Sequence, residues 1–341
     1  MPDEPLQKIL SALRLSEPTP CSGENLSTQL GVSRAQIWKH ISQLRKRGYE
    51  IDGAAGGGYR LVQSPDRLYA EEIKADLNTQ WLAREIVHFE QTESTNQDAS
   101  DLARKGAAHG TTVIAESQTA GRGRLGRDFY SPAHQNLYTS IVLRPALSMA
   151  EIPTLLLSAG LAVARTVSET LESSEAVEIK WPNDVLIKGL KTSGILMELE
   201  AEENRITSAI LGIGVNLNID PKEFPEEFRR TATSLGSQMG RVVDRVLFAQ
   251  RLFQILEQII DLHCESGFKA VRSQFESFFK MKGKDIRVAA VDGKIISGRT
   301  RGIAANGALE IEMPGGQVKN VLAGDVTICK PTNQLEETEN G

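Results

Sequence analysis

Apolar residues at helical spacing predict three helices within the first 48 residues. Ser22 and Ser33 are typical N-cap residues for the second and third helices, and Gly31 breaks the chain between them. Helices in this succession, with a glycine in the turn, are typical of a helix-turn-helix. The apolar stripes of the three helices are Leu6, Ile9, Leu10 and Leu13, then Leu26 and Leu30, then Ile37, Ile41 and Leu44.

Two alternating segments after Gly48 predict a β-hairpin, in which residues 49–51 pair with 59–62 around a glycine-rich tip at 53–58. A hairpin directly after a helix-turn-helix makes the winged variant of that motif. The chain continues through Pro65 into a charged segment, which we interpret as a linker to a larger domain.

Strand and helix patterns alternate in the centre of the chain and predict a mostly antiparallel α+β domain. Helices are predicted over 150–172 and 244–279. The predicted strands are 86–90, 111–117, 138–143, 176–181, 183–187, 193–200 and 205–217.

Short alternating strands from Asp285 to Ile328 predict a small β-barrel near the C-terminus. Turn dipeptides separate these strands at Asp292-Gly293, Asn306-Gly307 and Gly315-Gly316. We therefore predict a multi-domain α+β chain. Its parts are a winged helix-turn-helix over 1–65, a larger domain over 66–280, a β-barrel over 281–330 and a disordered acidic tail over 331–341.

Composition narrows the class of protein. With 341 residues, 40% of them hydrophobic, and a net charge of −5, the chain is an ordinary globular protein and not one coated with nucleic acid, although a local basic face is compatible with this charge. Cys21, Cys264 and Cys329 are far apart, so neither a disulfide framework nor a zinc site is expected. No apolar run approaches the ~20 residues of a membrane span. We expect a cytoplasmic protein without membrane contact.

The most informative segment runs from Gln118 to Arg127 and interleaves three arginines with three glycines. It contains Gly-x-Gly-x-x-Gly, but a dinucleotide fold requires a helix at these glycines, and here Pro132 follows without a helical pattern. Glycine allows close approach of the backbone, and arginine binds phosphate or carboxylate with two hydrogen bonds. The composition indicates a mobile anion-binding loop, with a solvated basic turn as the alternative.

Three further segments are weaker taken singly. Residues 180–184, Lys-Trp-Pro-Asn-Asp, offer a carboxylate for magnesium or ribose, but they are also good turn chemistry. Lys191 opens a predicted strand, where a lysine is usually solvated. Gly212 and Gly214 interrupt another strand, which indicates either close approach of a ligand or a bulge.

Together these segments resemble the bifunctional biotin–protein ligase and biotin-operon repressor family. The motif order covers the central domain, and the winged helix and barrel match the family's three-part plan, so the resemblance extends over nearly the whole chain. It implies a class II synthetase-like ligase domain and an SH3-like C-terminal barrel. The motifs are Ser94-Thr95-Asn96, Gln118-x-x-Gly121-Arg122-Gly123-Arg124-x-Gly126-Arg127, Lys180-Trp181-Pro182-Asn183-Asp184, Lys191-x-x-Gly194-Ile195-Leu196 and Gly212-x-Gly214-x-Asn216.

The resemblance assigns a role to each matching position. Lys191 and Arg122 are implied as catalytic, and Asp184 as a magnesium ligand. The biotin site would comprise Ser94, Thr95, Asn96, Gln118, Gly121, Arg122, Gly123, Arg124, Lys191, Gly212 and Gly214. The ATP and adenylate site would comprise Arg124, Arg127, Phe129, Lys180, Asn183, Asp184 and Asn216.

The implied reaction has two steps. Biotin and ATP form biotinyl-5'-AMP, and the biotinyl group then passes to a lysine of the biotin carboxyl carrier protein of acetyl-CoA carboxylase. Both first reactants are anionic, so Lys191, Arg122 and Mg²⁺ would offset their repulsion. The chain departs from the family pattern at three places: Leu125 and Asp128 stand where basic residues are expected, and Phe129 where tryptophan is expected. Phe129 can still stack on adenine.

The third predicted helix is the candidate recognition helix. Arginine and glutamine near its start can contact base edges, and later basic residues can contact phosphates. The expected DNA-binding residues are Ser33, Arg34, Gln36, Lys39, His40, Arg47 and, on the wing, Arg60. The resemblance implies operator DNA as a partner and a homodimer when the adenylate is bound; a winged helix kept only as a regulatory flap is the alternative.

Two other functions compete with this interpretation. A lipoate ligase shares the fold and the adenylate chemistry, but it does not need the Gly-Arg-Gly-Arg loop or the winged helix. A biotin sensor without transfer activity is the second alternative, against which the retained Lys191, Arg122 and Arg124 argue.

Overall fold

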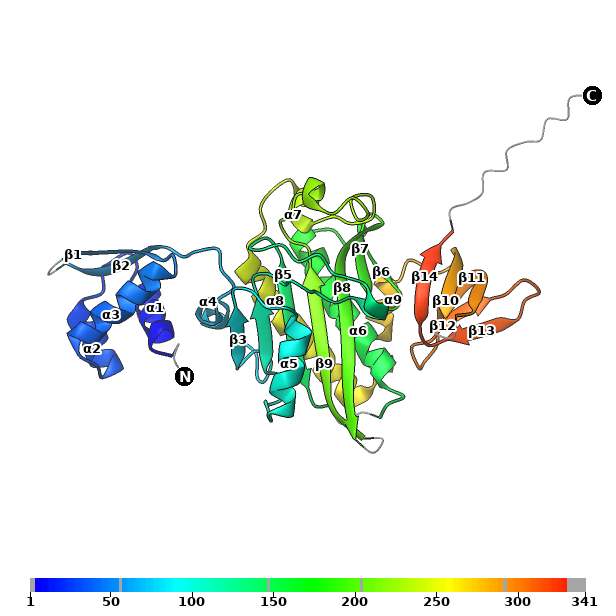
Figure 1. The fold of residues 1–341 in the computed structure, drawn as a ribbon, viewed down its shortest axis with the longest axis horizontal. Helices are drawn as coiled ribbons and strands as arrows, with labels where there is room; N and C mark the ends of the chain where they lie inside the picture. Colours follow the sequence, from blue (N-terminus) through cyan, green and yellow to red (C-terminus); the bar gives the residue numbers. More distant parts are fainter. Residues whose placement is uncertain (1–3, 55–56, 146–147, 203–204, 291–292, 330–341) are drawn as a thin grey trace, which may run out of the picture.

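The computed structural model describes residues 4–54, 57–145, 148–202, 205–290 and 293–329, in three parts along one long axis (Figure 1). The predicted tail over 331–341 lies outside the described residues. No helix in the described part of the chain is both long and apolar enough to cross a membrane.

The N-terminal part is a winged helix-turn-helix, as the sequence predicts. The hydroxyls of Ser22 and Ser33 accept backbone N–H groups of Asn25 and Gln36 at 3.0 and 3.3 Å, and Gly31 ends the second helix in the left-handed region. The residues of the predicted apolar stripes are buried, except Leu30, which is half-buried. The elements are α1 (Glu4–Ser16), α2 (Gly23–Leu30), α3 (Arg34–Lys46), β1 (Glu50–Ala54) and β2 (Gly58–Gln63).

The central part is a seven-stranded sheet in the order β3-β4-β5-β9-β8-β7-β6. Only the β3–β4 pair is parallel among these neighbours. The strands are β3 (Ile86–Phe89), β4 (Thr112–Ala115), β5 (Leu137–Leu143), β6 (Val177–Lys180), β7 (Asp184–Ile187), β8 (Leu190–Glu202) and β9 (Arg205–Val215).

Helices cover both faces of this sheet. Alternation along β4 sends Val113 into a small cluster with α5 and Ile114 into the main core with α6 and α8, so these helices lie on opposite faces. The helices are α4 (Ala70–Ala75), α5 (Thr95–Arg104), α6 (Ile152–Leu171), α7 (Leu235–Met239), α8 (Arg245–Ser266) and α9 (Arg272–Phe278), with the 3-10 turns η1 (Arg124–Gly126), η2 (Pro221–Glu223) and η3 (Phe268–Ala270).

One prediction about the helices was wrong, and one helix was not predicted. The helix predicted over 244–279 is broken, because Gly267 adopts φ 72° and ends α8 before η3 and α9. Helix α5 was not predicted, because its buried stripe consists mostly of small or polar side chains.

The C-terminal part is a five-stranded antiparallel sheet in the order β13-β12-β11-β10-β14. Its apolar residues belong to the same core as the central helices, and Trp181 Nε1 donates to the Gly307 carbonyl at 3.0 Å. The C-terminal sheet is therefore packed firmly against the central part, while the closed barrel predicted from the sequence stays a prediction. Its strands are β10 (Asp285–Ala290), β11 (Ile295–Ile303), β12 (Leu309–Glu312), β13 (Val318–Val321) and β14 (Gly324–Ile328).

Candidate functional site

A pocket of about 700 Å³ opens between the central sheet, the arginine loop and the C-terminal sheet. Most of the residues implicated by sequence line it, although they come from distant segments. Gly121 and Asn216 do not; both are buried beside it. The sequence-predicted residues in its walls are Ser94, Thr95, Asn96, Gln118, Arg122, Gly123, Arg124, Arg127, Phe129, Lys180, Asn183, Asp184, Lys191, Gly212 and Gly214.

One end of the pocket is a set of polar side chains held in fixed orientations. Gln118 Oε1 accepts the Thr95 N–H at 2.9 Å and the Thr95 hydroxyl at 3.1 Å, where α5 begins. Asn96 Oδ1 accepts the Ser140 hydroxyl at 2.6 Å, and Asn96 Nδ2 donates to Glu198 Oε2 at 2.7 Å. Such placed donors and acceptors suit a small polar ring that must be bound in one orientation.

The strand glycines permit close side-chain approach, as the sequence suggests, but Gly212 does so for another protein residue. A Cβ on Gly212 would lie 2.1 Å from Asn96 Oδ1, so Gly212 makes room for Asn96. Gly214 is paired with Gly194 across β9 and β8, and a Cβ on Gly214 would lie 2.6 Å from the Phe129 ring. Gly212 also lines the pocket, so the space it leaves for Asn96 is a second reason for glycine at this position.

The arginine loop has the conformation of a hairpin and opens no α-helix, which excludes the dinucleotide-binding geometry. Phe129 N–H donates to the Gly121 carbonyl at 2.8 Å, and Gly123 N–H donates to the Arg127 carbonyl at 2.6 Å. Leu125, at the turn, has φ 58° and an exposed side chain. The loop is therefore closed by its own backbone bonds.

Each arginine of the loop has a different environment. Arg124 Nη1 donates to Asn183 Oδ1 at 3.0 Å, and burial lowers the pKa of this arginine. Arg127 Nη2 lies 2.5 Å from Asp325 Oδ2, and the hydrogen bond to this carboxylate raises the pKa of Arg127. Arg122 is exposed and has no ion-pair partner among the described residues. Arg122 is the loop cation most available to an incoming anion.

Lys191 is held in place from several directions. Its Nζ lies 2.7 Å from Asp184 Oδ1, and its side chain crosses Gly194, where a Cβ would come within 3.2 Å of Nζ. Its backbone N–H donates to the Thr231 carbonyl at 2.7 Å, and its carbonyl accepts the Thr233 N–H at 2.9 Å. The lysine is thus a fixed positive charge at the pocket wall.

Several residues that line the pocket or orient its lining side chains were not found from the sequence. Asp325 comes from β14 of the barrel, 198 residues from Arg127, and a single aspartate in a strand carries no local signal. Ser140 and Glu198 orient Asn96 without belonging to a motif. Residues from the segment 227–232 also line the pocket, and no prediction was made for that segment from the sequence.

Asp184 is the only predicted metal ligand, and its side chain is 18% exposed beside the pocket. No group of three or more His, Cys, Asp or Glu side chains within the described ranges could hold a metal ion. Mg²⁺ commonly binds through one or two carboxylates together with substrate phosphates. The single Asp184 carboxylate fits that mode.

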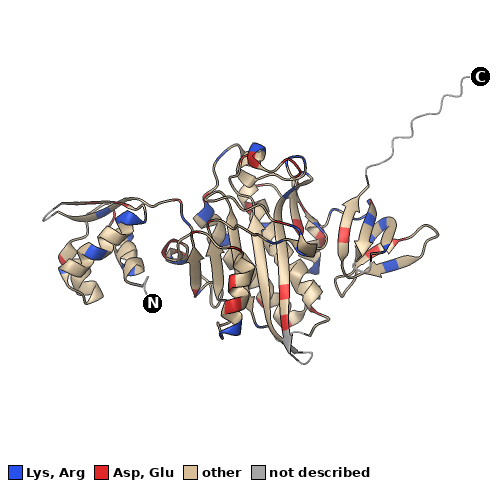
Figure 2. Cartoon of the chain, in the orientation of Figure 1, with Lys and Arg blue, Asp and Glu red and all other residues tan. Residues whose placement is uncertain are grey.

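The DNA-binding residues expected on α3 differ in their exposure and in their contacts. Arg34, Gln36 and Lys39 are exposed, and Figure 2 shows the basic positions of this part. His40 is half-buried, with Nδ1 3.2 Å from Gln43 Oε1. Ser33 serves as the helix cap described above.

Two of the residues predicted to contact DNA form ion pairs within the protein, and one exposed candidate was not predicted. Arg47 lies 2.5 Å from the buried Glu71 of α4, so it joins the winged helix to the central part. Arg60 lies 2.8 Å from Asp52 on the wing. Trp38 is 60% exposed in the middle of α3, which is unusual for a tryptophan and was not predicted.

Comparison with known proteins covers all three parts. Sequence profiles match residues 5–60 as an HTH domain, residues 88–216 as the Biotin/lipoate A/B protein ligase family, and residues 283–328 as the Biotin protein ligase C terminal domain.

Individual relatives span nearly the whole length. The chain is 36% identical to the Bifunctional ligase/repressor BirA of Bacillus subtilis over 90% of this chain and 93% of the relative. It is 30% identical to the protein of that name from Escherichia coli, over 90% and 92% respectively. The structure of a biotin protein ligase from Aquifex aeolicus in complex with biotin and ATP is similar with a TM-score of 0.63 and 28% identity, covering 72% of this chain and all of that one.

Proposed function

Because the chain belongs to the bifunctional biotin–protein ligase and repressor family, we propose that it biotinylates an acceptor protein at the expense of ATP and represses transcription through its winged helix. The observation that carries the ligase assignment is the meeting of Lys191, Gln118 and the arginine loop around one pocket. We further propose that residues 66–280 form the ligase domain and residues 1–65 the DNA-binding domain.

In the first step, a biotin carboxylate oxygen attacks the α-phosphorus of ATP, and the bond to the leaving pyrophosphate breaks. Gln118 and Thr95 would hold the ureido ring, which places the carboxylate toward Lys191. Lys191 and Arg122 would stabilise the negative charge that builds on the phosphate oxygens. Phe129, above the glycine pair, would stack on the adenine.

In the second step, the acceptor lysine amine attacks the carbonyl carbon of the mixed anhydride. The new C–N bond forms, AMP leaves with the electron pair of the C–O bond, and the amine loses a proton. Arg124 and its bond to Asn183 would keep the arginine loop over the anhydride and exclude water.

Magnesium would be held by Asp184 together with ATP phosphates. When bound, the ion supplies positive charge to the leaving pyrophosphate. Asp184 now pairs with Lys191, so its carboxylate also orients the lysine amine.

A direct experiment tests the ligase assignment. Purified protein, ATP, magnesium and biotin are incubated with a biotin carboxyl carrier domain, and the product is detected with streptavidin. We expect labelling of the acceptor lysine that requires both ATP and biotin. A mass increase of the acceptor by a lipoyl group in place of a biotinyl group, measured by mass spectrometry, or no mass increase with either acid, would contradict the proposal.

DNA binding gives a prediction about Trp38. An exposed apolar ring on a recognition helix suits contact with thymine methyl groups in a major groove. We expect Trp38→Ala to weaken binding about tenfold for a duplex selected by the wild-type protein from a random library with biotin and ATP.

The matched control is Lys39→Ala, the neighbouring exposed residue on the same helix. This variant should lower the salt dependence of binding by about one phosphate contact, whereas Trp38→Ala should leave it unchanged and relax base preference. If Trp38→Ala binds and discriminates like wild type, the ring has no role in base recognition.

The oligomeric state gives another prediction. One helix-turn-helix makes a small interface, so tight operator binding usually needs two modules about 34–36 Å apart along the DNA. We propose that biotinyl-5'-AMP favours a homodimer; a tenfold gain requires only about 1.4 kcal/mol of ligand preference for the dimer. Sedimentation should show dimers with a non-hydrolysable adenylate analogue and fewer with biotin alone. A monomer in both cases would contradict the proposal.

We also propose a cytoplasmic location, since operator DNA and the carrier protein are found there and the three cysteines are free.

A further inference from the structure

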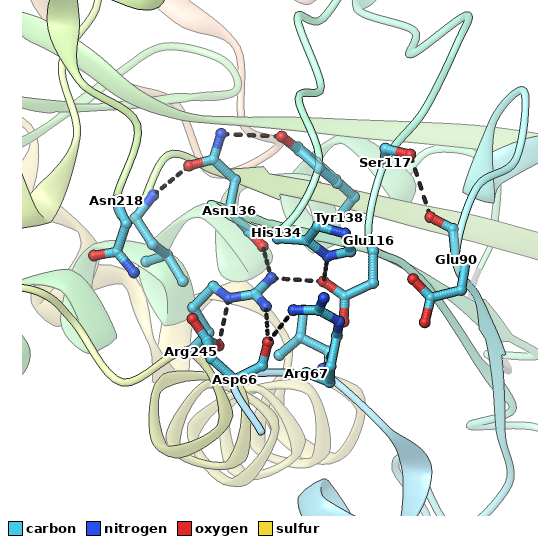
Figure 3. A network of polar contacts seen from close by, with 12 residues as sticks. Asp66, Arg67, Glu90, Glu116, Ser117, His134, Asn136, Tyr138, Asn218 and Arg245 are labelled. Atoms are coloured by element: carbon cyan, nitrogen blue, oxygen red, sulfur yellow. Dashed lines mark hydrogen bonds and ion pairs between the residues drawn. The ribbon is translucent and has the colours of Figure 1, made fainter. Parts of the chain in front are cut away.

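Arg245, the first residue of α8, is fully buried and bonds to three separate segments of the chain (Figure 3). Its Nε lies 2.8 Å from Asp66 Oδ1, and its Nη2 donates to the Asp66 carbonyl at 2.8 Å. Its Nη1 donates to Glu116 Oε2 at 2.8 Å and to the Asn136 carbonyl at 3.2 Å. One planar guanidinium therefore fixes the three segments relative to one another.

Glu116, directly after β4, is the buried counter-charge. Its other oxygen accepts the Leu68 N–H at 2.7 Å, and its carbonyl accepts the His134 N–H at 3.2 Å. Burial alone would raise the pKa of Glu116, but the His88 imidazole 3.5 Å away, the charge of Arg245 and the Leu68 N–H outweigh burial and lower it to about 2. Glu116 is therefore ionised throughout the neutral range, and the pair with Arg245 is permanent.

Two of these segments lead directly to the ligand pocket. Gln118, which orients Thr95, stands two residues after Glu116 on the same extended segment. Asn136 Nδ2 donates to the Tyr138 hydroxyl at 2.9 Å, and the Tyr138 ring meets Phe129 edge-on at 6.3 Å between ring centroids. The polar end and the aromatic side of the pocket thus share one buried support.

The third segment leads to the winged helix. The chain after Asp66 runs into α4, which carries the contacts with the N-terminal part. Arg14 Nη2 lies 2.6 Å from Glu72 Oε2, and Arg47 Nη1 lies 2.5 Å from Glu71 Oε1. Both glutamates are nearly inaccessible, so α4 and the winged helix are joined by close ion pairs. The segment predicted as a linker is therefore bonded at both ends.

We propose that Arg245 and Glu116 are positioning residues for the ligand pocket, and that their hold on Asp66 and Leu68 couples the pocket to the position of the winged-helix domain. This inference rests on the proposed function. It adds the contacts by which the winged-helix domain responds to a ligand in the pocket. A displacement of one segment must be followed by the guanidinium, because an unpaired buried charge is strongly destabilising. Coupling of this kind is reciprocal, so a pocket ligand that changes the affinity for the operator is itself bound with an affinity changed by the same factor when the operator is bound.

Charge reversal at the linker tests the coupling without touching the pocket. Asp66 is 56% exposed, so Asp66→Lys leaves Arg245 paired with Glu116 while repelling the linker. Hydrogen exchange is measured on peptides covering 64–75 in the full chain, with and without biotin, ATP and magnesium. We expect ligands to slow exchange at least threefold in wild type and to have no effect in Asp66→Lys. Pyrophosphate release, measured on the same samples, reports whether each protein still binds its substrates and forms the adenylate.

The matched control is Asp285→Lys, which makes the same charge change at another exposed aspartate, 63% exposed and paired with Arg299 on the C-terminal sheet. This variant should keep the full ligand response. Arg245→Lys tests positioning directly, because lysine keeps the buried positive charge but cannot make the several hydrogen bonds of the planar guanidinium. We expect its KM for biotin to rise about tenfold with a smaller change in kcat.

The outcomes separate the inference from the function on which it rests. If the wild-type protein releases pyrophosphate but hydrogen exchange at residues 64–75 is the same with and without ligands, the coupling is wrong and the ligase assignment stands. If ligands slow exchange in Asp66→Lys as much as in wild type, the coupling is wrong. If Arg245→Lys has the wild-type KM for biotin, Arg245 does not position the pocket. No pyrophosphate release by wild type would overturn both the function and the inference.

Discussion

Replacement of Lys191 by alanine is expected to slow adenylate formation by about 10²–10³-fold, the usual effect of removing one preorganised donor to a developing charge. The lysine amine is fixed by Asp184 and by its place over Gly194, so it needs no rearrangement when charge builds on the phosphate. ATP binding should weaken far less, because the interaction is strongest in the transition state. Single-turnover quench with labelled ATP measures the rate, and equilibrium dialysis measures ATP binding.

Lys188→Ala is the matched control, since Lys188 is an exposed lysine in the turn just before β8 and does not line the pocket. It should react at the wild-type rate. An unchanged single-turnover rate in Lys191→Ala would show that this lysine does not stabilise the reacting phosphate.

Arg124→Gly is expected to release biotinyl-5'-AMP about 10–100-fold faster than wild type while leaving the fold intact. The reason is the Arg124–Asn183 hydrogen bond, which ties the arginine loop to the opposite wall of the pocket. Hydrogen bonds to charged groups contribute about 1.5–3 kcal/mol, which corresponds to that range of rates. Escape is measured by chasing labelled adenylate and by biotinylation of bystander lysines.

A control for loop flexibility is available in the same turn. Leu125→Gly adds a glycine beside Arg124, but the Leu125 side chain is 61% exposed and has no group that could form a hydrogen bond across the pocket. Its adenylate should leave at nearly the wild-type rate. Equal rates for Arg124→Gly and wild type would mean that the arginine does not hold the loop closed.

Regular elements with strong patterns were predictable. The three N-terminal helices follow from apolar spacing and from the caps Ser22 and Ser33, whose effect extends over only a few residues. The breaks were less predictable: α5 lacks a large apolar stripe, and Gly267 interrupts a pattern that continues on both sides. Tertiary packing decided these cases.

The sequence by itself determined the chemistry that the protein carries: glycines interleaved with arginines, a lysine opening a strand, and polar residues where α5 begins. Residue type and spacing fix these properties, and no folding is needed to read them. Only the tertiary structure decided which residues come into contact. Strand register and domain packing bring together positions that are distant in the sequence, and no local sequence pattern indicates that they pair. The tertiary structure brought Asp325 to Arg127 across 198 residues, paired Arg47 with Glu71 of α4, and buried Asn216 beside the pocket.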